Sequence, residues 1–189
     1  RQMFLGIDHE YSTDREGNLD TQMNWVGPFL LFDNGSMLFG GWVNMTEGLD
    51  EPFEIRDEVE VPIGTYRYNQ GVVQFMGDRS RRLSFSAGTS FGGFYDGSLF
   101  ALNAGGRLRP HRRLTLSLEY FRNRVRLPVS GGHFTTNLVV TRAVLAFSSR
   151  AYLRGLFQFN DDEEESAVNL LFRYTYRPGA DFFIVYNEE

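Results

Sequence analysis

Residues 114–120 read Leu114-Thr115-Leu116-Ser117-Leu118-Glu119-Tyr120, and this stretch decides the fold. Apolar side chains alternate with polar ones, which is the period of two that an extended strand imposes on its two faces. The same alternation fits residues 82–91, 152–160 and 168–177. The sequence therefore predicts β-strands with one apolar face and one polar face.

The connections between these strands indicate how the strands are joined. Eleven strands are predicted, near residues 2–10, 19–32, 37–46, 60–77, 82–95, 98–108, 113–124, 136–147, 151–160, 166–177 and 181–187. Compact connections such as Asp33-Asn34-Gly35-Ser36 and Arg177-Pro178-Gly179-Ala180 contain the Asn-Gly or Pro-Gly sequences of tight turns. Most of the connections between them are longer. Strands joined in this way run antiparallel.

The amino-acid composition favours a membrane environment for such a sheet. Aromatic residues make up 15% of the chain, with 18 Phe and 9 Tyr. Aromatic side chains in nearly every strand suit a sheet that meets lipid and its interface. No apolar run reaches the roughly 20 residues of a membrane-spanning helix. We predict an all-β fold, an antiparallel up-and-down transmembrane β-barrel with about 10–12 strands present, in one domain over residues 1–189.

The two kinds of connection differ in charge. The compact connections are rich in arginine, for example Arg79, Arg112 and Arg150, whereas residues 47–58 and 161–165 are acidic. Bacterial outer-membrane barrels have short periplasmic turns and longer extracellular loops. We therefore expect a location in the bacterial outer membrane, with both acidic loops at the cell surface.

An odd number of strands indicates an incomplete barrel. Bacterial single-chain barrels have an even number of strands. An open sheet edge in lipid leaves unpaired backbone groups, each of which costs several kcal/mol. We expect missing barrel strands or other barrel subunits to complete a larger barrel.

The C-terminal region carries a resemblance to a known family. The stretch Tyr174-Thr175-Tyr176-Arg177-Pro178-Gly179-Ala180-Asp181-Phe182-Phe183-Ile184-Val185-Tyr186-Asn187-Glu188 resembles the penultimate hairpin of a family of uncharacterised bacterial outer-membrane proteins. Residues 154–160 and 169–174 are also similar to that family. Its members join an N-terminal domain resembling family-nine carbohydrate-binding modules to a large C-terminal barrel. The resemblance implies that this chain is part of such a barrel, and it supplies no catalytic residues.

The polar face of the predicted strands supplies the candidate functional residues. Six side chains are predicted to line the lumen: Glu119, Arg142, Arg154, Gln158, Asn169 and Arg173. The residues predicted to face outer-membrane lipid are Leu114, Leu116, Leu118, Tyr120, Val168, Leu170, Phe172 and Tyr174. This arrangement favours a pore or transport conduit for a saccharide or another small solute, or a membrane platform for an attached carbohydrate-binding-like domain.

A soluble lipocalin-like ligand-binding barrel is the alternative hypothesis. Such a barrel would turn its apolar face inward around a ligand. The position of the aromatic side chains decides between the two hypotheses, because a membrane barrel directs them outward.

No group of residues indicates catalysis, a metal site or a cofactor. His9, His111 and His133 are far apart in the sequence, whereas a hydrolase needs a nucleophile held by an oriented base. The acidic run 161–165 lacks the spacing and glycine of a calcium loop. The chain has no cysteine, and its net charge of -5 argues against nucleic acid. We expect a protein that is not an enzyme.

Overall fold

The structure is a computed structural model that describes residues 1–162 and 164–188. These residues form thirteen strands, and no helix occurs among them. The strands are β1 (Gln2–Thr13), β2 (Leu19–Leu31), β3 (Met37–Leu49), β4 (Phe53–Arg56), β5 (Val59–Val61), β6 (Gly64–Met76), β7 (Leu83–Phe94), β8 (Gly97–His111), β9 (Leu114–Arg126), β10 (His133–Ala146), β11 (Ala151–Asn160), β12 (Glu165–Arg177) and β13 (Ala180–Glu188). None of the described residues belongs to a helix that could serve as a membrane span.

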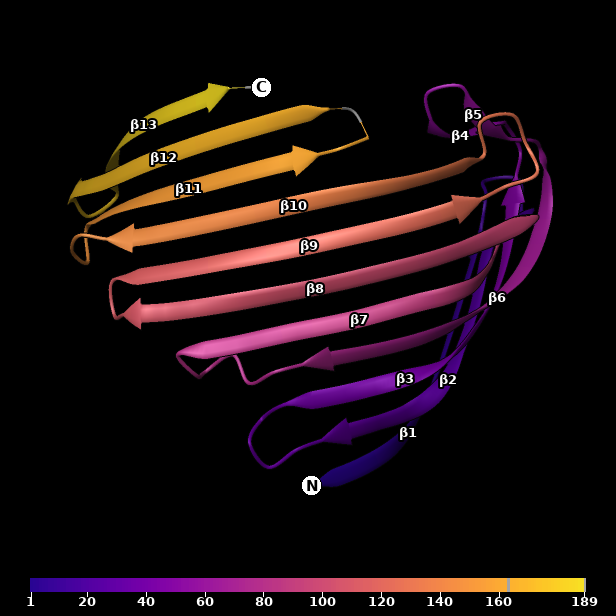
Figure 1. The fold of residues 1–189 in the computed structure, drawn as a ribbon, viewed down its shortest axis with the longest axis horizontal. Coiled ribbons are helices and arrows are strands. Elements are labelled where there is room, and N and C mark those ends of the chain that lie inside the picture. The colour runs from indigo at the N-terminus through magenta and orange to yellow at the C-terminus, as the bar shows by residue number, and fades with distance from the viewer. Residues whose placement is uncertain (163, 189) are drawn as a thin grey trace. The chain divides into compact units, whose positions relative to one another are not determined.

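Eleven of the strands form one large sheet in chain order, from β1, β2, β3 and β6 through to β13 (Figure 1). The pairs from β1 to β6 and from β10 to β13 are antiparallel. The prediction of an all-β, up-and-down sheet is confirmed, and its eleven strands correspond to the eleven predicted ones. The sheet is not closed, because β1 and β13 are its two edges. The described residues therefore do not form a complete barrel.

The connections differ less in length than the sequence predicted. β1 continues to Thr13, β10 begins at His133 and β12 begins at Glu165, so the strands extend into three of the predicted long loops. What remains of these loops spans residues 14–18, 127–132 and 161–164, which is no longer than the compact connections 32–36 and 77–82. Strand pairing extends because each added pair satisfies backbone groups. The prediction that these three loops are longer than the compact connections was thus wrong. Residue 163 of the predicted 161–165 loop lies outside the described residues.

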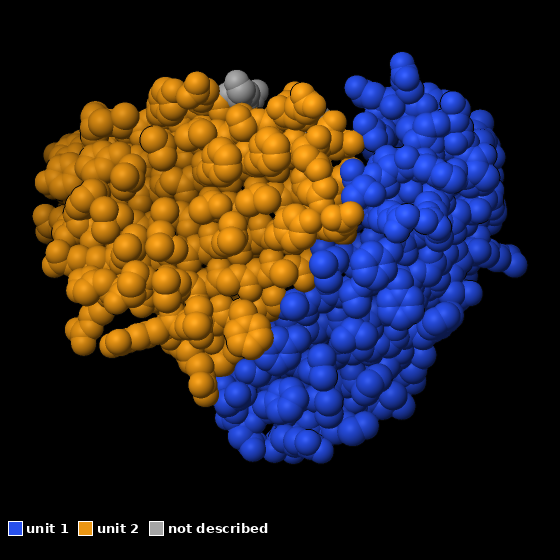
Figure 2. Space-filling view, viewed as in Figure 1, with its two compact units in different colours: residues 1–76, 87–102, 123–135 blue, residues 77–86, 103–122, 136–189 orange. Residues whose placement is uncertain are grey.

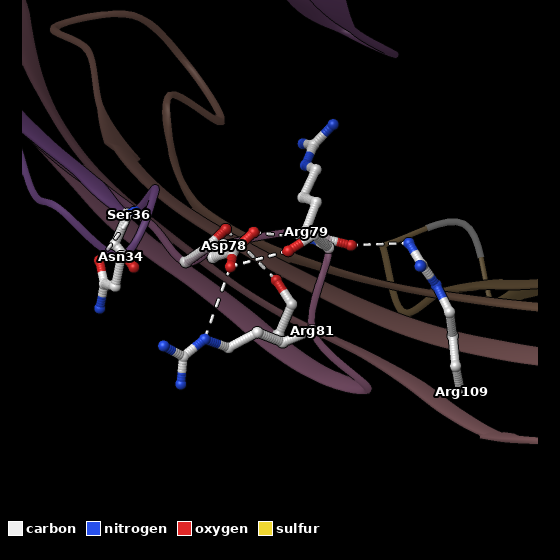
Figure 3. A network of polar contacts seen from close by, with 9 residues as sticks. Asn34, Ser36, Asp78, Arg79, Arg81 and Arg109 are labelled. Atoms are coloured by element: carbon white, nitrogen blue, oxygen red, sulfur yellow. Dashed lines mark hydrogen bonds and ion pairs between the residues drawn. The ribbon is translucent and has the colours of Figure 1, made fainter.

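Polar side chains fix the compact β6–β7 turn, which Figure 3 shows. Asp78 accepts hydrogen bonds from the backbone N–H and the hydroxyl of Ser80, both at 2.8 Å. Arg81 Nε lies 3.5 Å from the same carboxylate. Arg109 of β8 donates to the carbonyl oxygen of Arg79 at 2.7 Å. This end of the strands is consequently both basic and hydrogen-bonded.

The chain divides into two compact units, which Figure 2 colours separately. Unit 1 comprises residues 1–76, 87–102 and 123–135, and unit 2 comprises residues 77–86, 103–122 and 136–189. The apolar core belongs to unit 1 and consists of Val59, Val61, Tyr66, Tyr68, Tyr95, Val125 and Leu127. Val61 is 2% exposed. The β4–β5 hairpin, which the sequence did not predict, therefore packs against one face of the unit 1 strands.

Tyr95 lies at the centre of this core cluster, in the short β7–β8 turn. Its ring centroid lies 4.8 Å from that of Phe94, 5.1 Å from that of Tyr66 and 5.8 Å from that of Tyr68. Its φ of 49° is uncommon for a residue with a side chain. Aromatic packing on several sides holds the turn in this strained conformation.

Unit 2 has almost no buried core. Among its described residues only Ser84 and Val140 are buried. A water-soluble sheet normally buries its apolar face against a second layer of structure. The described residues of unit 2 form no second layer over its strands.

Candidate functional site

Strand register separates the side chains of unit 2 into two faces. Arg142 lies opposite Leu156, Val144 lies opposite Arg154, and Leu156 lies opposite Asn169. We call this face the polar face; it comprises Arg142 and Val144 of β10, Arg154, Leu156 and Gln158 of β11, and Asn169, Leu171 and Arg173 of β12. The apolar face carries Thr141, Ala143, Leu145, Leu153, Gly155, Phe157, Val168, Leu170, Phe172 and Tyr174. The register thus places Arg154 and Arg173 on the face opposite Leu170 and Phe172.

The polar face contains a groove of about 360 Å³. Its lining residues are Arg107, Thr115, Ser117, Arg142, Val144, Arg154, Gly155, Leu156 and Asn169. Three guanidinium groups, two hydroxyls and one amide therefore border the same space. These groups can donate several hydrogen bonds to a polar or anionic solute.

One of the three groove arginines has an acidic partner. Arg142 Nη1 donates to Glu119 Oε2 at 2.8 Å, and both side chains remain 40–45% exposed. The side chains of Arg107 and Arg154 make no ion pair or hydrogen bond with any residue that the structure describes. The groove thus has an excess of positive charge.

The structure places the six predicted lumen residues on one face but not in one site. Arg142, Arg154 and Asn169 line the groove, and Glu119 joins it through its ion pair with Arg142. Gln158 lies outside the groove, opposite Val140 and Ala167. Arg173 pairs instead with Asp181 of β13 at 2.7 Å.

Three polar residues of the groove were missed by the sequence prediction: Arg107, Thr115 and Ser117. Arg107 lies inside β8, near the end of the strand that leads into an arginine-rich compact turn. The signal that could have found it is the alternation of exposed Leu102 and Leu108 with Asn103 and Arg107.

The polar face becomes less polar toward the β13 edge. Leu171 lies opposite Val185, and Arg173 lies opposite Phe183 with its guanidinium 5.8 Å from the ring centroid. The prediction of one fully polar face is therefore too simple for the last two strands. An apolar stretch on both faces of a strand, as in β13, is typical of a strand whose two faces are both shielded from water.

Unit 1 has a polar ladder on the face opposite the core cluster. His9, Asn24, Asn44 and Asn69 lie side by side on β1, β2, β3 and β6. His9 Nδ1 donates to Asn24 Oδ1 at 2.7 Å, and Asn44 Nδ2 donates to Asn69 Oδ1 at 3.0 Å. Trp42 Nε1 also donates to Asn69 Oδ1, at 3.2 Å.

Between this amide ladder and the β2–β3 turn, the same face of unit 1 is apolar and exposed. Its exposed side chains toward the β2–β3 turn are Met3, Leu5, Ile7, Val26, Trp42 and Val73. Ile7 is 78% exposed. The ladder therefore marks a boundary between an apolar belt and a polar zone, with Trp42 at that boundary.

Comparisons with protein-family models, with curated proteins and with solved structures find no match.

Proposed function

We propose that this chain is a segment of a bacterial outer-membrane β-barrel, with its apolar face against lipid and its polar face lining a conduit for small polar solutes. The observation that carries the proposal is the missing core of unit 2. Leu118, Phe157, Phe159, Leu170 and Tyr174 are exposed, and the other described residues of unit 2 form no layer over them. In water such a surface would be a large apolar patch. In a bilayer the same surface would contact lipid tails, which are apolar.

The distribution of side chains along unit 1 supports the same proposal. The apolar belt ends at the row of amides, where the indole N–H of Trp42 finds its acceptor. Tryptophan is enriched at membrane interfaces because its ring is apolar and its N–H is polar. The hydrogen bonds of the ladder would satisfy the amides at the level where lipid tails give way to headgroups.

The groove supplies the conduit surface. Its Arg, Thr, Ser and Asn side chains are polar, whereas a lipocalin-like pocket would present the aromatic side chains to its ligand. The excess positive charge of Arg107 and Arg154 would favour anionic over cationic solutes. The soluble-barrel alternative is therefore less well supported by the side chains of this groove.

The two sheet edges support a barrel with more strands than the described ones. Edge strand β13 exposes Phe182, Phe183, Ile184, Val185 and Tyr186, five consecutive large side chains. An exposed apolar edge strand pairs readily with another strand. We propose that further barrel strands, from the same protein or from other subunits, pair with β1 and β13. A platform for an attached carbohydrate-binding-like domain would use the same membrane insertion.

Solute flux through proteoliposomes tests the conduit. Ser117→Trp puts a large ring into the groove, whereas Leu118→Trp puts the same ring on the other side of β9. If the groove lines a conduit, Ser117→Trp lowers the release of a small anionic solute and Leu118→Trp leaves it near the wild-type rate. Equal release of the solute from both variants would contradict the proposed conduit.

A further inference from the structure

A second depression lies at the far end of β9 from the compact turns, within unit 1. It has a volume of about 470 Å³ and is lined by Arg124, Val125, Arg126, His133, Phe134 and Thr135. A hydrogen bond from Leu127 N–H to the carbonyl oxygen of Gly132, at 2.8 Å, joins the ends of β9 and β10 here. Counting back along both strands brings Arg126 opposite His133 and Arg124 opposite Thr135. We call these four side chains the basic pocket.

The basic pocket faces away from the core cluster. Val125 belongs to that cluster and Phe134 packs against it, so both side chains point toward the β4–β5 hairpin. Alternation directs their neighbours Arg124, Arg126 and His133 to the opposite side. On the neighbouring strand β8, Leu99 packs against the core cluster, so alternation directs the exposed side chains of Phe100 and Leu102 to the same side as the pocket.

The positive charge of the pocket is uncompensated. Arg124 and Arg126 are exposed, and neither forms an ion pair or a side-chain hydrogen bond with the residues that the structure describes. The ring of His133 likewise has no such partner. Two guanidinium groups beside a hydroxyl and an imidazole match a phosphate group, which accepts bidentate hydrogen bonds.

The pocket lies at the ends of two strands of unit 1. Arg126 is the last residue of β9 and His133 is the first residue of β10. The strands of a membrane barrel end at the membrane interface. With Phe100 and Leu102 against lipid tails, the basic pocket meets lipid headgroups.

We infer that the basic pocket binds the phosphate of an anionic lipid headgroup. This inference rests on the proposed membrane location of the chain. The lipid tails would lie against Phe100 and Leu102 of β8, while the guanidinium groups of Arg124 and Arg126 hold the phosphate. A free phosphate ester has the same headgroup chemistry but gains nothing from the apolar side chains.

Lipid retention by the whole chain in a neutral maltoside detergent, read by native mass spectrometry, tests the inference. The probe is phosphatidic acid, and diacylglycerol with the same acyl chains is the control lipid without phosphate. The test variant is Arg124→Gln with Arg126→Gln. The matched variant is Arg112→Gln with Arg113→Gln, which removes two exposed charges at the other end of β9.

We expect the pocket variant to bind phosphatidic acid about tenfold more weakly than the wild type, and the matched variant to change binding less than about twofold. Diacylglycerol should bind all three proteins alike. Equal loss in the two variants would overturn the inference, because it would mean general charge attraction. Retention that glycerol 3-phosphate abolishes at the same concentration as the lipid would overturn the lipid as the source of the phosphate.

The inference and the proposed function fail in different ways. If Leu118 contacts lipid and the pocket variant keeps its phosphatidic acid, the pocket inference is wrong and the membrane location stands. If Leu118 does not contact lipid, the proposed function itself is wrong. An unchanged thermal unfolding midpoint of the pocket variant will show that its fold is intact.

Discussion

At the scale of single residues, neighbours on β9 have opposite environments. Leu116 lies on the face proposed to contact lipid, and Thr115 lines the polar groove. Leu116→Arg should reduce the free energy of unfolding in vesicles by about 2–4 kcal/mol if the residue lies near the midplane. Thr115→Arg should cost less, because the added charge meets a hydrated groove. Urea titration of both variants measures the difference, and equal destabilisation would contradict the assignment of the two faces.

The Glu119–Arg142 ion pair should contribute little to stability. Both side chains are about half exposed, and ion pairs of this kind contribute about 0–1 kcal/mol. A double-mutant cycle with Glu119→Gln and Arg142→Gln should give a coupling energy in that range. A coupling above about 2 kcal/mol would mean that the pair is shielded from water and that the groove is not an aqueous surface.

Alternation predicted which face each of these residues occupies, but it did not predict their partners. It placed Glu119, Arg142, Arg154 and Asn169 together because a strand repeats every two residues. The ion pairs depend on strand register, which the alternation alone leaves open between neighbouring strands. This is why the partner of Arg173, which is Asp181, was not predicted.

At the scale of elements, the β4–β5 hairpin carries the core of unit 1. Val61 is almost completely buried, so Val61→Ala removes two buried methyl groups and leaves a cavity. We expect the free energy of unfolding to fall by about 2 kcal/mol. Faster hydrogen exchange of the amides in residues 53–61 should accompany the loss. Unchanged exchange would mean that the hairpin does not depend on this packing.

The hairpin itself could not be predicted from the sequence. Its strands contain four and three residues, which is too short for a clear alternation. The surrounding residues 47–58 are acidic and are therefore typical of a solvated loop. The hairpin forms because Val59 and Val61 pack in one cluster with Tyr66 and Tyr68. Such tertiary packing cannot be inferred from the alternation of residues within a short segment.

The β6–β7 turn should respond to acid. Hydrogen bonds from Ser80, with a smaller contribution from Arg81, hold the pKa of Asp78 below its ordinary value of 3.8. A lowered pKa means that the carboxylate stabilises the turn above pH 3.8 and loses this effect as the pH falls through the lowered pKa. Hydrogen exchange or NMR shifts of the Ser80 amide between about pH 5 and about pH 2 should follow this titration. Asp78→Asn should remove the pH dependence. If the turn titrates equally in the wild type and the variant, the assignment of this effect to Asp78 is wrong.

At the scale of the whole molecule, the order and number of the sheet strands were predictable from turn chemistry. Asn-Gly and Pro-Gly turns join consecutive strands, so an up-and-down sheet follows from the chain order. The lengths of the other connections were not predictable, because strand pairing continues as long as backbone groups find partners. The predicted orientation depends on the contrast of charge between the basic turns and the acidic segments 47–58 and 161–165, and it stays a prediction.

The central claim is that the exposed apolar face meets lipid while the opposite face meets water. Spin labels at Leu118 and Leu170 on the apolar face, and at Ser117 and Asn169 on the polar face, test it in a lipid-reconstituted sample. We predict that the first pair collides more often with oxygen, which concentrates in lipid, and the second pair with a water-soluble nickel reagent. Equal accessibility of the two pairs, or the reverse order, would contradict the membrane-embedded sheet.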